Sequence, residues 1–138
     1  MPSLRDVFFK SSSVDLSLLV FRCFFGITML LAHGLPKLQR FSEIQNTFPD
    51  PFGIGSPASL AMAVFAEFAC AMAVAAGLIF RLALIPLVVT MFVAAFVIHG
   101  QDPFQKQELA LAYLAAYVGL MFSGPGRYSL DSLLWKSK

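Results

Sequence analysis

A polar stripe runs along one face of the first long apolar segment of the chain. Steps of four, three and four residues, which are the spacing of one helical face, connect Arg22, Gly26, Met29 and His33. Lys37 lies one more turn along the same face. Ionisable side chains are expensive inside a bilayer and are usually paired. The stripe therefore predicts a polar path from mid-membrane to one surface.

A carboxylate in the second apolar segment is expected at the depth of the stripe. At about 1.5 Å per residue, Glu67 and Arg22 both lie about 15 Å from the outer ends of their helices, which are the ends on the side of His33. A lone charge in low dielectric would be uncompensated, so we expect Arg22 and Glu67 to form an ion pair. Such a pair serves either a reaction or only the register of the two helices, and both interpretations stay open.

Two histidines and a second carboxylate are expected at one end of a helical bundle. His33 closes the first helix, His99 closes the third, and Glu108 opens the fourth, all on the same side. This gathering predicts a cavity suited to proton-coupled chemistry on an amphipathic ligand. An interfacial hydrogen-bonding role is the alternative for each histidine. The predicted catalytic residues are His33, His99, Glu67 and Glu108, and the predicted cofactor-binding residues are Lys37 and Arg22.

Motifs for common cofactors are absent from the sequence. No H-x-x-x-H pair, C-x-x-C pair, phosphate loop or dinucleotide fingerprint occurs, so we expect neither a metal site nor a nucleotide cofactor. The two histidines leave haem open as an alternative, against which the missing ligand motif argues. Cys23 and Cys70 lie within helices and are expected to pack rather than to form a disulfide.

The elements that must position these residues are membrane-spanning helices. Of the 138 residues, 58% are hydrophobic and only 13% are charged, and the mean hydropathy is +0.75, which a soluble domain could not accommodate. Charged residues cluster between long apolar runs. We therefore predict one all-α domain over residues 1–138, a bundle of four transmembrane helices at about 14–33, 58–80, 82–99 and 106–122.

The distribution of Lys and Arg predicts the orientation of the bundle. One side holds Arg5, Lys10, Arg81, Arg127, Lys136 and Lys138, and the other holds Lys37, Arg40 and Lys106. Because cytoplasmic flanks are enriched in these residues, both termini are expected in the cytoplasm. No basic stripe with interleaved aromatic residues lies outside the spans, so nucleic acid is not an expected partner.

Two connecting segments have recognisable chemistry. Residues 38–57 are too many for an ordinary helix connection, and they predict a short amphipathic helix on the outer side followed by a turn-rich loop. This segment is either a lid over the cavity or a simple seal. Near the C-terminus, Gly124 and Pro125 should end the fourth helix, and Ser129 or Asp131 should cap a short amphipathic helix.

The order and spacing of these motifs resemble the DoxX family over nearly the whole chain. The residues that carry the resemblance are His33-Gly34-Leu35-Pro36-Lys37-Leu38, Glu67, Gly77, Arg81, Glu108 and Gly124-Pro125-Gly126-Arg127-Tyr128-Ser129-Leu130-Asp131. The resemblance implies a small protein of the bacterial inner membrane related to a subunit of a thiosulfate:quinone oxidoreductase. It implies a redox-linked role with quinone as the cofactor, but it identifies no substrate.

Three functional interpretations follow. In the first, the chain contacts quinone through the predicted cavity, alone or with a partner redox protein. In the second, it is a non-catalytic scaffold or assembly subunit for a redox or stress-response complex. In the third, it carries a small amphipathic solute, which four short helices without an inverted repeat do not favour. Membrane lipid is a partner in all three, and whether the chain is an enzyme or a homo-oligomer stays open.

Overall fold

The computed structural model describes residues 13–135, and every regular element within them is a helix. The first long helix consists of α2 (Val14–Met29), the π-helix η1 (Leu30–Gly34) and α3 (Leu35–Gln39) without interruption. It is therefore longer than the predicted span 14–33. The short helix α4 (Phe41–Ile44) follows at once, where an amphipathic helix was expected.

Two further long helices also contain a π-helical segment each. The second consists of α5 (Ser56–Val64), η2 (Phe65–Cys70) and α6 (Ala71–Ala76). The third consists of α7 (Phe80–Phe92) and η3 (Val93–Ile98). These bounds agree with the predicted spans 58–80 and 82–99 to within a few residues, and the second helix ends earlier because Gly77 adopts a left-handed conformation with φ 71°.

The last long helix is α8 (Phe104–Ser123), close to the predicted 106–122. Gly124 ends it, as expected from the sequence. The short helix α9 (Leu130–Leu134) follows, and the hydroxyl of its N-cap residue Ser129 accepts a hydrogen bond from the backbone N–H of Ser132. Of the two predicted capping residues, Ser129 is the one that caps α9.

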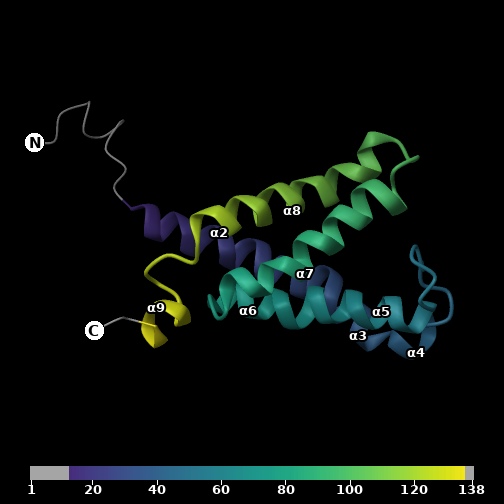
Figure 1. The fold of residues 1–138 in the computed structure, drawn as a ribbon, viewed down its shortest axis with the longest axis horizontal. Coiled ribbons are helices and arrows are strands. Elements are labelled where there is room, and N and C mark those ends of the chain that lie inside the picture. Colours follow the sequence, from purple (N-terminus) through teal and green to yellow (C-terminus); the bar gives the residue numbers. More distant parts are fainter. Residues whose placement is uncertain (1–12, 136–138) are drawn as a thin grey trace, which may run out of the picture.

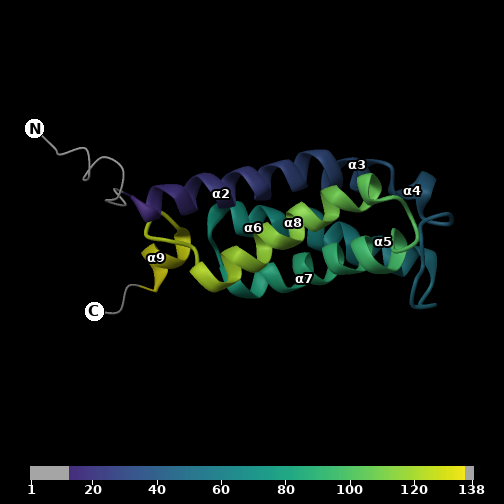
Figure 2. The ribbon, with the colours of Figure 1, turned by 90° about the horizontal axis from the view of Figure 1, so that it is seen from above.

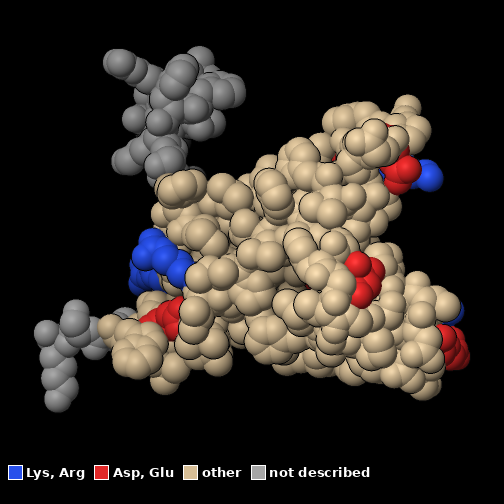
Figure 3. All heavy atoms as spheres, turned by 45° about the vertical axis from the view of Figure 1, so that its right-hand side comes forward, with Lys and Arg blue, Asp and Glu red and all other residues tan. Residues whose placement is uncertain are grey.

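Within residues 13–135, three helices are long and apolar enough to cross a membrane: Val14–Gln39, Ser56–Ala76 and Phe80–Ile98. The 20-residue helix α8 is not among them. Large apolar side chains such as Phe24, Phe65 and Leu82 are more than half exposed along these helices, as expected for surfaces in contact with lipid. On the face drawn in Figure 3, charged side chains lie toward the two ends of the molecule.

The helices form an elongated bundle with two distinct ends (Figures 1 and 2). The start of α2, the turn between α6 and α7, and α9 lie at one end, which we call the clasp end. We call the opposite end, formed by α3, α4, the start of α5, η3 and the start of α8, the cavity end. Toward the cavity end, the hairpin of α7 and α8 diverges from α3 and α5 (Figure 1).

The core lies where α6 packs against both α2 and α7. The second helix is rich in alanine, and small side chains let helix backbones approach each other. Its contacts with two neighbours agree with this composition. The bulkiest fully buried side chains of this core include Met29, Phe80 and Tyr117.

Candidate functional site

Three π-helical segments lie toward the cavity end, one in each of the candidate spans. η1 contains His33, η2 contains Glu67, and η3 ends directly before His99. A π-turn holds one extra residue and is frequent at functional sites, because it redirects side chains that an α-helix would place elsewhere. The three predicted site residues thus share an unusual backbone context that the sequence did not reveal.

Helices η1 and η2 approach each other very closely at Gly34. A Cβ atom there would overlap the backbone carbonyl of Glu67, so only glycine fits this position. The close approach brings the next turn of the first helix beside the Glu67 side chain. Lys37 Nζ donates a hydrogen bond of 2.5 Å to Glu67 Oε2, and the side chains are 23% and 6% exposed, respectively.

This ion pair replaces the one expected between Arg22 and Glu67, and that prediction was wrong. The first helix does not end at His33 but continues to Gln39, so Lys37 can reach the level of Glu67. The long, flexible side chain of a lysine can extend along the helix surface to a buried carboxylate. The carboxylate of Glu67 is compensated in this way inside the bundle.

His33 lies beside the ion pair with its ring against an aromatic neighbour. The ring is 5.7 Å from that of Tyr113, in an edge-to-face arrangement. The Tyr113 hydroxyl donates a hydrogen bond of 3.1 Å to Thr28 Oγ1, so the orientation of its ring is fixed. Among residues 13–135, no hydrogen bond to the His33 imidazole is present, which leaves both ring nitrogens available to a ligand.

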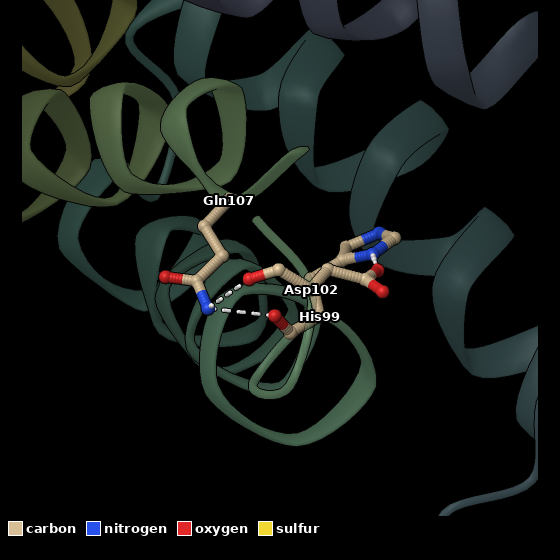
Figure 4. Close-up of polar contacts among 3 residues, drawn as sticks. All are labelled: His99, Asp102 and Gln107. Carbon is tan, nitrogen blue, oxygen red and sulfur yellow. Dashed lines mark hydrogen bonds and ion pairs between the residues drawn. The ribbon is translucent and has the colours of Figure 1, made fainter. Parts of the chain in front are cut away.

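His99 is held at the start of the connection to α8 (Figure 4). Its Nδ1 lies 2.7 Å from Asp102 Oδ2, and Gln107 Nε2 donates a hydrogen bond of 2.7 Å to the His99 carbonyl. The hydrogen bond from His99 lowers the pKa of Asp102 below its ordinary value. With Nδ1 engaged, Nε2 is the nitrogen through which His99 could contact another group.

A cavity of about 410 Å³ lies between the diverging helix pairs at the cavity end. Four of the six predicted site residues line it, namely His33, Lys37, Glu67 and His99. Most of the other lining side chains are apolar, and they come from all four long helices and from the loop after α4. An apolar cavity with a few convergent polar groups is typical of sites for small organic ligands.

Four further polar residues line the cavity that the sequence did not single out: Ser59, Thr90, Lys106 and Tyr113. Tyr113 and Thr90 lie in apolar runs, where a hydroxyl carries no motif. Lys106 was counted only for orientation, although its place in the first turn of α8 near His99 was a usable signal. Its position gives the cavity a second ammonium group.

Glu108 does not line the cavity, although it was expected there. Its side chain is exposed, while Lys106, Leu109 and Ala110 are the residues of this turn that face the cavity. Helical periodicity explains the difference, because Glu108 lies on a different face of α8 from Leu109 and Lys106. The place of Glu108 at the start of α8 therefore did not predict the direction of its side chain.

Arg22 also lies away from the cavity, at the clasp end. Its side chain is 2% exposed and donates hydrogen bonds to three backbone carbonyls, those of Ala75 at 3.2 Å, Pro125 at 2.6 Å and Tyr128. Backbone carbonyls that follow a helix end carry partial negative charge and compensate a buried cation. Arg22 thus ties the C-terminal end of α6 to the segment that follows α8.

A second set of contacts completes this clasp. The Asp131 carboxylate accepts hydrogen bonds of 2.8 and 2.9 Å from the backbone N–H groups of Ile79 and Phe80, which begin α7. Asp15 Oδ1 accepts one of 2.9 Å from the Arg127 backbone. Asp131, one of the two residues expected to cap α9, thus caps the start of α7 instead.

Metal-ion ligands are not gathered in the part of the chain that the structure describes. No group of three His, Cys, Asp or Glu side chains is placed there to hold a metal ion. Cys23 and Cys70 are free thiols. The imidazole, ammonium and carboxylate groups that line the cavity can form hydrogen bonds and exchange protons.

Comparison with known proteins identifies the chain by family. The family model DoxX matches residues 17–100, which include the ion pair of Lys37 with Glu67 and both histidines. Comparison with curated proteins and with solved structures found no match. With three helices of spanning length and a family match over more than half of its residues, this integral membrane protein belongs to the DoxX family.

Proposed function

We propose that this chain is a redox-linked membrane subunit that binds the ring of a quinone in the cavity. The observation that carries the proposal is the placement of polar groups in an otherwise apolar space of about 410 Å³. His33 and the ion pair of Lys37 with Glu67 come from the first two helices, while His99 and Lys106 come from the other two. Donors on different walls suit the two carbonyl oxygens of a quinone, and apolar walls suit its ring.

Proton exchange is the chemistry that these side chains add. Conversion of a quinone to a quinol takes up two electrons and two protons, one proton at each oxygen. A partner redox protein is the proposed source of the electrons, and His33 and His99 are the proposed proton donors. Imidazole is suited to this task because its ordinary pKa, about 6.5, lies near neutral pH.

Ligand-induced thermal stabilisation tests the proposal directly. A short-tailed ubiquinone analogue should raise the melting temperature of the purified wild-type protein, and His33→Ala or His99→Ala should abolish that shift while leaving the unliganded protein folded. Glu108→Gln is the matched control, because Glu108 is exposed and does not line the cavity. The shift should also change as pH passes through the histidine range.

The scaffold interpretation predicts the opposite result. If quinone analogues give no shift at any pH, and both histidine variants support the same cellular phenotype as the wild type, the redox site is wrong. Co-purification of a stoichiometric partner with either variant would then identify the chain as an assembly subunit. The two interpretations are thus separated by one set of variants.

The membrane topology is a second part of the proposal. We propose that α8 crosses the membrane with the three candidate spans, that the bundle lies in a bacterial inner membrane, and that both termini are cytoplasmic. The support is the excess of Lys and Arg on the side of the two termini. Four of these residues, Arg5, Lys10, Lys136 and Lys138, lie outside the described part of the chain. The start of α2 and α9 share the clasp end, which agrees with an even number of crossings (Figure 1).

Cysteine labelling of intact cells tests this topology. A membrane-impermeant maleimide should modify Ser42→Cys, which lies in α4, and should not modify Ser137→Cys, which lies outside the described residues. Labelling of Ser137→Cys alone would reverse the orientation, and labelling of both would exclude an even number of crossings. The wild-type chain, with its mid-helix Cys23 and Cys70, is the control.

A further inference from the structure

We infer that the cavity opens sideways to the bilayer, through a portal between α5 and α7 edged by Met62 and Val89. Its ligand would then be an uncharged, lipid-soluble ring compound that arrives from the membrane and not from water. The identity of that ligand rests on the proposed function, whereas the route of access does not.

The first observation is that some cavity-lining side chains are also on the molecular surface. Met62 and Val89 line the cavity and are 63% and 53% exposed, respectively. Both belong to candidate spans, Ser56–Ala76 and Phe80–Ile98, whose exposed faces contact lipid. A cavity wall that reaches the surface at such positions is in contact with acyl chains.

The second observation concerns the packing of the four helices around the cavity. At the cavity end, α3 packs against α5, and η3 packs against α8. The two pairs diverge from each other in Figure 1. The cavity lies between these pairs, so its sides are the places where the helices are not closed against one another.

The third observation is that the end of the cavity is covered by a loop with its own hydrogen bonds. The Asp50 carboxylate accepts hydrogen bonds from the backbone N–H groups of Ile54 and Gly55 and from the Ser59 hydroxyl. The Ser56 hydroxyl donates one of 2.6 Å to the Phe48 carbonyl. These bonds tie the loop to the start of α5, so its apolar side chains form a wall over the cavity.

The fourth observation is the pairing of charges inside the cavity. Lys37 and Glu67 neutralise each other at 2.5 Å, and His99 is paired with Asp102 at 2.7 Å, while Lys106 of the lining is exposed. A cation taken into such a space would lose its hydration without meeting an unpaired carboxylate of the lining, and an anion would meet only the exposed Lys106, so entry of an ion is unfavourable in low dielectric. An uncharged ring whose oxygens accept hydrogen bonds loses far less hydration free energy on entering the cavity. Such a ring can also pass an apolar portal.

Thiol labelling inside the cavity tests the route without any quinone. Ala94 lines the cavity from η3, and Ala94→Cys places a reporter there in a Cys23→Ala, Cys70→Ala background. In lipid nanodiscs, a long-chain N-alkylmaleimide should modify this thiol faster than a charged, membrane-impermeant maleimide does. Met62→Trp and Val89→Trp should each slow the N-alkylmaleimide reaction several-fold, because the indole fills the portal.

Matched controls keep the result specific. Met72→Trp and Val97→Trp introduce the same side chain at positions that are 47% and 49% exposed and do not line the cavity, and they should leave the rate unchanged. Equal slowing by the control variants, or faster reaction with the charged reagent, would overturn the portal. Slowing by Leu109→Trp alone would place the opening at α8 and would equally overturn it.

The same variants separate the portal from the proposed function. Slower labelling together with a quinone-induced thermal shift in the parent supports both. Slower labelling without any such shift supports the portal and contradicts quinone as its ligand. A thermal shift with unchanged labelling rates contradicts the portal and leaves the quinone site in place.

Discussion

The two ends of the bundle each bury one charged side chain, but they compensate it in different ways. At the clasp end, Arg22 is 2% exposed, and its hydrogen-bond partners are three backbone carbonyls. At the cavity end, Glu67 is 5% exposed, and its partner is the side chain of Lys37. Backbone partners tie chain segments together, whereas a side-chain pair beside a cavity can change its protonation or partner when a ligand arrives.

This difference shows that burial of a charge does not by itself indicate a reactive site. Arg22 and Glu67 are the two buried charged side chains of the described chain. Only Glu67 lines a cavity. The chemical nature of the partner, and the presence of space beside it, distinguish a structural role from a functional one.

The largest expected effect is on stability at the clasp end. Arg22→Gln leaves at least one of the carbonyls of Ala75, Pro125 and Tyr128 without a donor, because a glutamine amide has only two N–H donors. We expect the free energy of unfolding to fall by about 3 kcal/mol. Unfolding of the detergent-solubilised protein by denaturant measures the loss.

The control for Arg22→Gln is a substitution of Glu67, which pairs with Lys37 at the cavity end and not with Arg22. Arg22→Gln and Glu67→Gln should have additive effects on the unfolding free energy, because the two side chains lie at opposite ends and share no partner. Partial rescue in the double variant would revive a direct pairing of Arg22 with Glu67 and would contradict the comparison of the two ends.

The next effect concerns the pair of Lys37 with Glu67. Lys37→Met and Glu67→Gln should each destabilise the protein, and the double variant should lose less than the sum of the two. A coupling energy of about 1 to 3 kcal/mol is expected for charged groups in direct contact within a bundle. A double-mutant cycle gives this coupling, and a value near zero would mean that the pair does not form in the membrane.

A smaller loss of stability is expected from the capping carboxylate of the clasp. Asp131→Asn keeps the size of the side chain but removes one acceptor for the N–H groups of Ile79 and Phe80. A cost of about 1 kcal/mol is typical for the loss of such a cap. Thermal unfolding measures it, and Ser132→Ala, one position further along α9, is the control. An equal loss in both variants would argue against a specific cap.

The smallest effect is a pH dependence of the loop over the cavity. Hydrogen bonds from the Ser59 hydroxyl and from the Gly55 backbone hold the pKa of Asp50 below its ordinary value. A lowered pKa in the folded state means that the carboxylate stabilises the loop above the ordinary value of about 3.8 and that this contribution is lost as pH falls through the lower value.

Hydrogen exchange in the loop reports this change. After correction for the intrinsic rate, protection of the Ile54 and Gly55 amides should decrease as pH falls below 4, because Asp50 accepts hydrogen bonds from both. Asp50→Asn should remove the pH dependence, whereas Glu43→Gln, an exposed change in α4, should not. Protection that is independent of pH in the wild type would show that Asp50 does not hold the loop.

The sequence predicted the elements well because apolar length and turn chemistry are local signals. The helix end at Gly124 and the cap at Ser129 were indicated by residue type, whereas the second helix ends at Ala76, earlier than the predicted span 58–80. Four of six site residues line one cavity, because topology places the ends of antiparallel helices together.

The errors arose where local signals conflict with the path of the backbone. Gly34 and Pro36 suggest the end of a helix, yet the backbone N–H of Leu35 bonds to the carbonyl of Leu30 and the helix continues in a wider turn. The depth of Arg22 had been counted from a helix end at His33, so the continuation of the helix made the predicted match with Glu67 wrong. The direction of the Glu108 side chain depends on how α8 is rotated about its own axis, and no local sequence pattern specifies that rotation.

The π-helical segments also have a consequence for how the bundle tolerates changes in length. Each π-turn accommodates one residue more than an α-turn, and one residue corresponds to a rotation of about 100° around the helix axis. Deletion of a single residue from η2 would turn a π-turn into an ordinary α-turn, so α5 and α6 would largely keep their present phase. Deletion of one residue from α8, which is α-helical throughout, would instead rotate the side chains on one side of the deletion by about 100° relative to the other, so residues of α8 that now line the cavity would turn toward lipid.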